Sequence, residues 1–82
     1  MSTGTSRLSR PIQPMPDDIA HRLKEAGLRA AYDERPPYQR NDYLGWIARA
    51  RRPRTREKRI AQMLDELARG GVYMAMKWGT QT

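Results

Sequence analysis

The sequence contains no cysteine and no phenylalanine among its 82 residues. Without cysteine, the chain has no disulfides, no thiolate zinc ligands and no thiol nucleophile, and we expect it to be cytoplasmic. No apolar run approaches the roughly 20 residues that span a bilayer. Residues 1–16 also lack the apolar stretch of a signal peptide. These absences leave one small domain, which buries roughly 60% of its unfolded surface.

Negative charge is also scarce, since 16 Lys and Arg stand against 9 Asp and Glu, giving a formal net charge of +7. Apolar residues make up 38% of the chain, which is low for a globular domain. Two tryptophans and four tyrosines nevertheless argue against a fully disordered chain. A positive surplus on a small folded domain predicts an anionic partner, either an acidic protein or a nucleic acid.

Prolines and glycines divide the first half of the chain. Residues 1–15 are rich in Ser, Thr, Gly and Pro without a helical or strand period, and we expect a disordered arm there. Order should begin at Pro16, with Asp17 as the N-cap of a first helix. Gly27 either lies inside that helix or takes the left-handed C′ position after it. A new i,i+4 pair, Leu28–Tyr32, favours the break.

The second half of the chain contains two longer helical patterns. Pro36-Pro37 separates them from the first half, and the helix that follows must end by Arg52 because residues before a proline avoid helical geometry. Thr55 can cap the next helix, which Gly70-Gly71 terminates. The tail, residues 72–82, is either a strand-like segment over the bundle or a partly ordered end, and no pair of strands is predicted.

These patterns predict an all-α fold, a small bundle of three to four short helices. The helical module should cover residues 16–71, between the disordered arm and the tail. Its core should consist of large apolar and aromatic residues that recur at helical spacing. These are Leu23, Tyr32, Tyr43, Trp46, Ile47, Ile60, Leu64 and Leu67.

The sequence carries no pattern typical of catalysis. His21 is the single histidine, so one chain cannot form a multi-histidine metal site. The acid pairs Asp17-Asp18 and Asp65-Glu66 are sequence neighbours that point to different sides of a helix, and we interpret them as helix-dipole and surface charges. No phosphate-binding glycine loop or nucleophile motif is present. We expect a non-enzymatic protein with no cofactor and no metal.

Positive charge is concentrated between Arg49 and Arg59, where seven cations accompany one acid, Glu57. Cations suit the end of a helix, but at the start of the next helix the dipole opposes them by roughly 0.3–1 kcal/mol each. The free amides of a helix start, surrounded by arginines, form an anion site. The candidate residues for binding an anion or partner are Arg51, Arg52, Arg54, Arg56, Lys58 and Arg59.

Two of these candidates have a structural alternative. Arg56 lies one turn before Ile60, so its stem can pack at the edge of the core. Its guanidinium could then pair with an acid from the preceding segments, namely Asp33, Glu34 or Asp42. For Arg59, surface binding and structural pairing are equally consistent with the sequence. The other cations form by default a solvated face, with binding as the second interpretation.

The same stretch resembles a known family. Trp46-Ile47, Ala50-Arg51-Arg52, Thr55-Arg56 and Arg59-Ile60 stand in the register of the C-terminal helical module of the bacterial YdeI/OmpD-associated family, also described as bacteriocin-protection proteins. The resemblance covers roughly residues 16–71. It implies a helical module without known catalytic residues. It also implies a link to resistance against cationic antimicrobial peptides and to an outer-membrane porin, hence to envelope stress.

We therefore predict a non-enzymatic interaction module that docks an acidic protein or another anionic partner through a basic helix-turn-helix surface. The alternative is weak, largely non-sequence-specific nucleic-acid binding through Arg49–Arg59, because two helices meet at a short turn around Pro53. Specific base readout is not expected, since only Gln62 follows the cations as a base-reading side chain. Membrane-surface binding is a third interpretation, but the core needs the apolar stripes.

Overall fold

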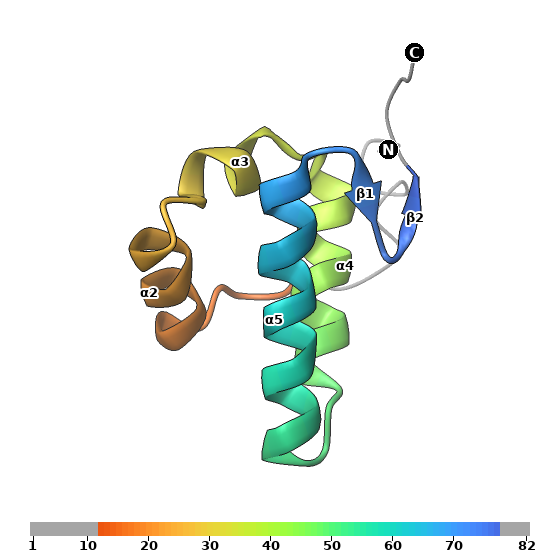
Figure 1. Ribbon diagram of the computed structural model, residues 1–82. Coiled ribbons are helices and arrows are strands. Elements are labelled where there is room, and N and C mark those ends of the chain that lie inside the picture. Colours follow the sequence, from red (N-terminus) through yellow and green to blue (C-terminus); the bar gives the residue numbers. More distant parts are fainter. Residues whose placement is uncertain (1–11, 78–82) are drawn as a thin grey trace, which may run out of the picture.

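The computed structural model describes residues 12–77. Most of the predicted arm (1–11) and the end of the tail (78–82) lie outside this range. Four helices account for most of the described chain, which confirms the all-α prediction (Figure 1). The elements are α2 (Asp17–Glu25), α3 (Arg29–Glu34), α4 (Pro37–Ala48), α5 (Pro53–Arg69), β1 (Val72–Tyr73) and β2 (Met76–Lys77).

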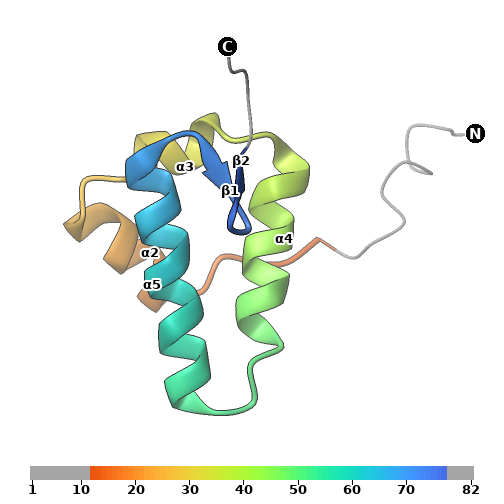
Figure 2. The same ribbon diagram turned by 45° about the vertical axis from the view of Figure 1, so that its right-hand side comes forward.

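The helices α4 and α5 form an antiparallel pair joined by a short loop at one end of the molecule (Figures 1 and 2). The short helix α3 contacts α5 near the opposite end, and α2 folds back beside it. After α5, the chain turns into the hairpin of β1 and β2, which lies against the same end of the pair (Figure 2). Two faces of α4 are therefore covered, one by α5 and one by the hairpin and the N-terminal segment.

Glycine ends two of the helices, as the sequence predicts. The break at Gly27 is confirmed, because this residue adopts φ 70° between α2 and α3. The Gly27 amide donates to the Lys24 carbonyl at 3.1 Å and the Leu28 amide to the Leu23 carbonyl at 2.9 Å, which is the Schellman pattern. Gly70 ends α5 in the left-handed region, with φ 86°.

Both predicted N-caps are wrong, because each helix begins earlier than its predicted cap requires. The N-cap of α2 is Pro16, with Asp17 inside the first turn, and the N-cap of α5 is Arg52, with Thr55 inside the first turn. Helix α5 begins at Pro53 because the fixed φ of proline suits the first helical position, where a missing N–H costs nothing. Neither helix has a side-chain cap.

The core lies where α2, α3 and the α4–α5 pair meet. Of the predicted core residues, Trp46 and Leu64 are half-buried and pack against the core from its edge, whereas the other six are buried. Leu44 and Met63 are additional core members. Met63 lies beside the predicted stripe of α5, whereas Leu44 was missed because helix α4 is covered on more than one side, so its buried residues do not form a single stripe. The buried apolar residues are Ile19, Leu23, Tyr32, Tyr43, Leu44, Ile47, Ile60, Met63 and Leu67.

The tail forms a hairpin that the sequence did not predict. Val72 pairs with Lys77 and Tyr73 with Met76 in antiparallel register. The two turn residues, Met74 and Ala75, have φ of 52° and 65°, a region that such turns usually fill with Asn or Gly. Their side chains make this backbone unfavourable, so the surrounding structure must hold it in place.

The carboxylate of Glu66 holds this turn. Its two oxygens accept hydrogen bonds from the Met74 and Ala75 amides at 2.8 and 2.7 Å, and from the Tyr43 hydroxyl and Gln62 amide at 2.5 and 2.9 Å. Glu66 is only 2% exposed. The prediction that it is a surface charge is therefore wrong, because the hairpin covers this face of α5 and its two amides, with Tyr43 and Gln62, replace water as donors.

A buried arginine stabilises the same junction. Arg35, between α3 and α4, is 4% exposed and donates to the backbone carbonyls of Glu66 and Val72 at 3.0 and 2.9 Å. It also donates to the Gln39 side chain at 3.1 Å. A cation at the C-terminal end of α5 is favoured by the helix dipole, and it adds a second donor to the Glu66 carbonyl, which also accepts the Gly70 amide at 2.9 Å.

We expect the free energy of unfolding to fall as the pH drops below about 5, because Glu66 then takes up a proton more readily in the unfolded chain than in the folded one. Burial alone would raise the pKa of Glu66, but the hydrogen bonds from Tyr43, Ala75, Met74 and Gln62 outweigh it and hold that pKa below its ordinary value of 4.5. A carboxyl with a lowered folded pKa stabilises the fold above its unfolded pKa, and this contribution is lost as the pH falls through the folded pKa. Urea denaturation from pH 7 to 3 tests this, and a stability that rises over that interval would contradict it.

Replacement of Glu66 by Gln should lower the free energy of unfolding by about 2–3 kcal/mol, because one acceptor oxygen is lost among buried donors. Asp65→Asn is the matched control, since Asp65 is an exposed neighbour paired with Arg69 on the same helix. It should change stability by less than about 0.5 kcal/mol. Equal effects of the two substitutions in urea denaturation would show that Glu66 has no special role. The pH dependence of the Gln variant should also be flatter than that of the unsubstituted protein.

Candidate anion-binding surface

The basic segment from Arg49 to Arg59 covers one end of the α4–α5 pair (Figure 1). It comprises the C-cap of α4, the connecting loop and the first two turns of α5. The structure separates its cations into two groups. One group is bound to neighbouring helices and the other faces solvent.

Arg56 belongs to the bound group. Its guanidinium meets the Asp18 carboxylate in a two-point contact, with N–O distances of 2.6 and 3.1 Å, and ties the start of α5 to the start of α2. The hydrogen bond from Arg56 lowers the pKa of Asp18. A structural role was one predicted alternative, but the predicted acids Asp33, Glu34 and Asp42 were wrong. The fold brings the first turn of α2, not the α3–α4 region, beside Arg56.

Arg22 forms a second two-point contact between the same helices. It donates to the Glu57 carboxylate at 3.0 and 2.8 Å. The Glu57 side chain is exposed and that of Arg22 is half-buried, so water screens the pair and its contribution to stability is small. Glu57, the one acid of the basic segment, is nevertheless paired with Arg22, which lies outside that segment. The charge of the other cations is therefore left without an acidic neighbour in their own stretch.

Arg59 is bound as well, to α4. Its Nη1 donates to the backbone carbonyl of Trp46 at 2.6 Å, and its guanidinium carbon lies 5.2 Å from the centre of the Trp46 ring. This combines a charge-assisted hydrogen bond with a cation–π contact. The sequence left surface binding and structural pairing open for Arg59, and these contacts correspond to structural pairing.

The remaining cations face solvent. Within residues 12–77, the structure records no side-chain hydrogen bond, ion pair or ring contact for any of them, and all are exposed. We call this group the loop cations: Arg49, Arg51, Arg52, Arg54 and Lys58. Of the predicted binding residues, Arg51, Arg52, Arg54 and Lys58 therefore remain candidates, and Arg49 is added to them. Arg56 and Arg59 are left out because their side chains are engaged within the molecule.

The N-terminus of α5 adds to this positive surface. Arg52 at the N-cap makes no side-chain capping bond, and Pro53 has no N–H. The amides of Arg54 and Thr55 therefore have no acceptor within the helix. These amides, the positive end of the helix dipole and the loop cations together favour an anionic group at this end of the molecule.

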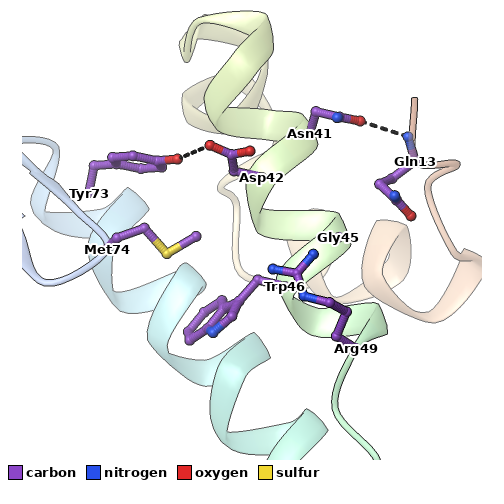
Figure 3. Close-up of a pocket in the computed structure, with 8 residues that line it drawn as sticks. All are labelled: Gln13, Asn41, Asp42, Gly45, Trp46, Arg49, Tyr73 and Met74. Atoms are coloured by element: carbon purple, nitrogen blue, oxygen red, sulfur yellow. Dashed lines mark hydrogen bonds between the residues drawn. The ribbon is translucent and has the colours of Figure 1, made fainter. Parts of the chain in front are cut away.

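A hollow of about 350 Å³ lies on the side of α4 next to the loop cations (Figure 3). We call it the α4 hollow. Its floor is a row of α4 residues at helical spacing, namely Asn41, Asp42, Gly45, Trp46 and Arg49. Gln13 borders it on one side, and Tyr73 and Met74 of the hairpin on the other.

Two hydrogen bonds fix the borders of the α4 hollow (Figure 3). The Gln13 backbone amide donates to the Asn41 side-chain oxygen, and the Tyr73 hydroxyl donates to Asp42, each at 2.6 Å. The sequence did not reveal the hollow because its walls come from the segment before α2 and from the hairpin. Neither segment carries a periodic pattern that predicts where it packs.

No catalytic geometry emerges around the single histidine. His21 is exposed on α2 and lies 3.2 Å from Glu25, one turn along the same helix. Among residues 12–77 no group of three or more His, Asp or Glu side chains could hold a metal ion. In the same range, no helix combines the length and apolar character needed to cross a membrane.

The fold and this surface define a small all-α domain with one strongly basic end. The family model described as bacteriocin-protection, YdeI or OmpD-associated matches residues 14–70, which is more than half of the chain. The chain belongs to this family, and the resemblance noted in the sequence is confirmed. No curated protein and no solved structure matches the chain.

The division between bound and free arginines predicts unequal effects on stability. Arg59→Ala should lower the free energy of unfolding by about 1–2 kcal/mol, because it removes a charge-assisted hydrogen bond and the contact with Trp46. Arg54→Ala, the control on the same helix, should change it by less than about 0.5 kcal/mol. Urea denaturation of both variants makes the comparison. A cost for Arg54→Ala as large as that for Arg59→Ala would mean that Arg54 is not free.

Proposed function

We propose that this protein is a non-enzymatic interaction module that docks an acidic protein through the loop cations. The single observation that carries the proposal is that these cations lie together at one helix start, exposed and without partners in the described chain, while their neighbours Arg56 and Arg59 are bound internally. Clustered like charges repel one another, so an anionic partner would stabilise this arrangement.

The family supports a protein as the partner. Its description refers to bacteriocin protection and to association with OmpD, which are both relations to other proteins. A role in envelope stress or antimicrobial-peptide resistance is part of this proposal. It rests on the family rather than on the geometry of the surface.

Weak nucleic-acid binding through Arg49–Arg59 is the second candidate, favoured by the exposed cations at the start of α5. The side chains that remain free on the first turns, Arg54 and Lys58, suit phosphate contacts. Gln62, the expected base reader, donates instead to Glu66 at 2.9 Å. The geometry therefore supports contact with the nucleic-acid backbone and not sequence-specific readout.

We expect a ten-residue glutamate peptide to shift the amide resonances of residues 51–58, and Arg54→Glu to weaken this binding severalfold through charge repulsion. Lys24→Glu is the matched control, because it makes the same charge change at an exposed position on α2. Similar weakening by both variants would show that overall charge, and not this surface, attracts the peptide.

A random-sequence DNA duplex tests the second candidate in the same titration. Five phosphate contacts by the loop cations would give a slope of about −4.5 in log K against log salt, or roughly a hundredfold loss between 50 and 150 mM salt. Duplex binding that persists at 150 mM salt while the glutamate peptide fails to bind would favour nucleic acid over an acidic protein.

A further inference from the structure

Residue 45, in the floor of the α4 hollow, is a buried glycine over which two side chains pack. A Cβ at this position would lie 3.3 Å from the Arg49 Nη1 atom and 3.4 Å from the Gln13 Cγ atom. A glycine in the middle of a helix costs helix stability relative to alanine. Here it lets the Arg49 guanidinium and the Gln13 side chain pack directly against the helix, at the edge of the hollow (Figure 3).

The apolar side of the hollow is held rigidly. Met74 extends from the hairpin toward the Trp46 ring (Figure 3), and its backbone, at φ 52°, is fixed by the Glu66 carboxylate. Trp46 is fixed in turn by Arg59, which contacts its ring and its carbonyl. The two residues thus form a preorganised apolar wall, so binding against it would require little further ordering.

The hollow has a negative charge at one end of its floor, Asp42, and a positive charge at the other, Arg49. Asp42 and Arg49 lie seven residues apart on α4, which is about 10 Å along the helix. Asp42 already accepts the Tyr73 hydroxyl, whereas Arg49 has no recorded partner within residues 12–77. Arg49 is also the first of the loop cations, so the hollow continues directly into the basic surface.

From these observations we infer that the α4 hollow receives one apolar side chain of an acidic peptide segment, beside a carboxylate that pairs with Arg49. This inference rests on the proposed function and specifies its partner. The apolar wall of Trp46 and Met74 would contact the anchoring side chain, and the loop cations would contact further acidic residues of the segment. A volume of about 350 Å³ accommodates a single large side chain with its neighbouring backbone.

Other occupants fit the hollow less well. An inorganic anion or a nucleic-acid backbone would use the cations but not the wall of Met74 and Trp46. A second copy of this chain would bring its own basic end toward Arg49, which opposes contact through like charge. An acidic segment with an apolar anchor is the one occupant that uses both the wall and the charge.

The test compares two capped probe peptides, Glu-Asp-Leu-Asp-Glu and Glu-Asp-Ser-Asp-Glu, by amide chemical-shift titration. Both place a carboxylate on either side of the centre, so either chain direction can reach Arg49. The leucine peptide should bind about tenfold more tightly than the serine peptide, because only leucine gains from apolar burial. It alone should shift the amides of Gly45 and Met74 and the indole N–H of Trp46.

Gly45→Ala is the decisive variant. Alanine is the better helix former, and the atoms its Cβ would meet belong to flexible side chains, so the variant should fold with equal or greater stability. Its methyl group should push the Arg49 and Gln13 side chains into the hollow, and so weaken the leucine peptide about tenfold and the serine peptide by a smaller factor. Thermal unfolding of the variant verifies that the fold is retained.

The possible results separate this inference from the proposed function. If both peptides bind equally and shift only residues 51–58, or if Gly45→Ala leaves the leucine peptide unchanged, the anchor site is wrong while the basic surface stands. If neither peptide shifts any residue and Arg54→Glu has no effect, the proposed function and the inference both fail. A leucine preference that Gly45→Ala reduces supports the inference.

Discussion

The hydrogen bonds to the Glu66 carboxylate connect the parts of this protein that no apolar stripe joins. One carboxylate receives donors from α4, from α5 itself and from the turn of the hairpin. Burial of such a charge is costly unless every lone pair has a donor, and here four donors surround it. The same contacts hold Met74 and Ala75 at positive φ. The turn of the hairpin, and with it the Met74 wall of the α4 hollow, therefore depends on this side chain, while Arg35 and Asp42 hold the strand β1.

The basic segment shows how one charge pattern can contain two kinds of arginine. Arg56 and Arg59 join α5 to α2 and α4, and their removal would act on the fold. The loop cations lie between and beside them but face solvent. The two bound arginines thus hold in place the helix on which some of the free cations lie. An arginine-rich stretch is consequently not a measure of binding capacity, because some of its charge is already neutralised within the molecule.

Much of the fold could be predicted from the sequence, because local rules govern it. The break at Gly27 and the end of α5 at Gly70 follow from the conformational freedom of glycine. The two N-caps were predicted incorrectly because Pro16 is itself the N-cap of α2 and Pro53 is the first residue of α5, so that Asp17 and Thr55 lie inside the first turns. The hairpin was missed because its turn lacks Asn and Gly, so that a distant carboxylate, and not local preference, stabilises it.

The sequence by itself determined the helices, most of the core and the location of the positive charge, since spacing and composition act over a few residues. Only the tertiary structure decided which charges are free. It buried Glu66 under the hairpin, paired Arg56 with Asp18 and placed Arg59 on Trp46. It also formed the α4 hollow from three separate segments. The physical reason is that a charged side chain takes its role from whichever donors or acceptors the fold brings within about 3 Å, and that proximity is not encoded in neighbouring residues.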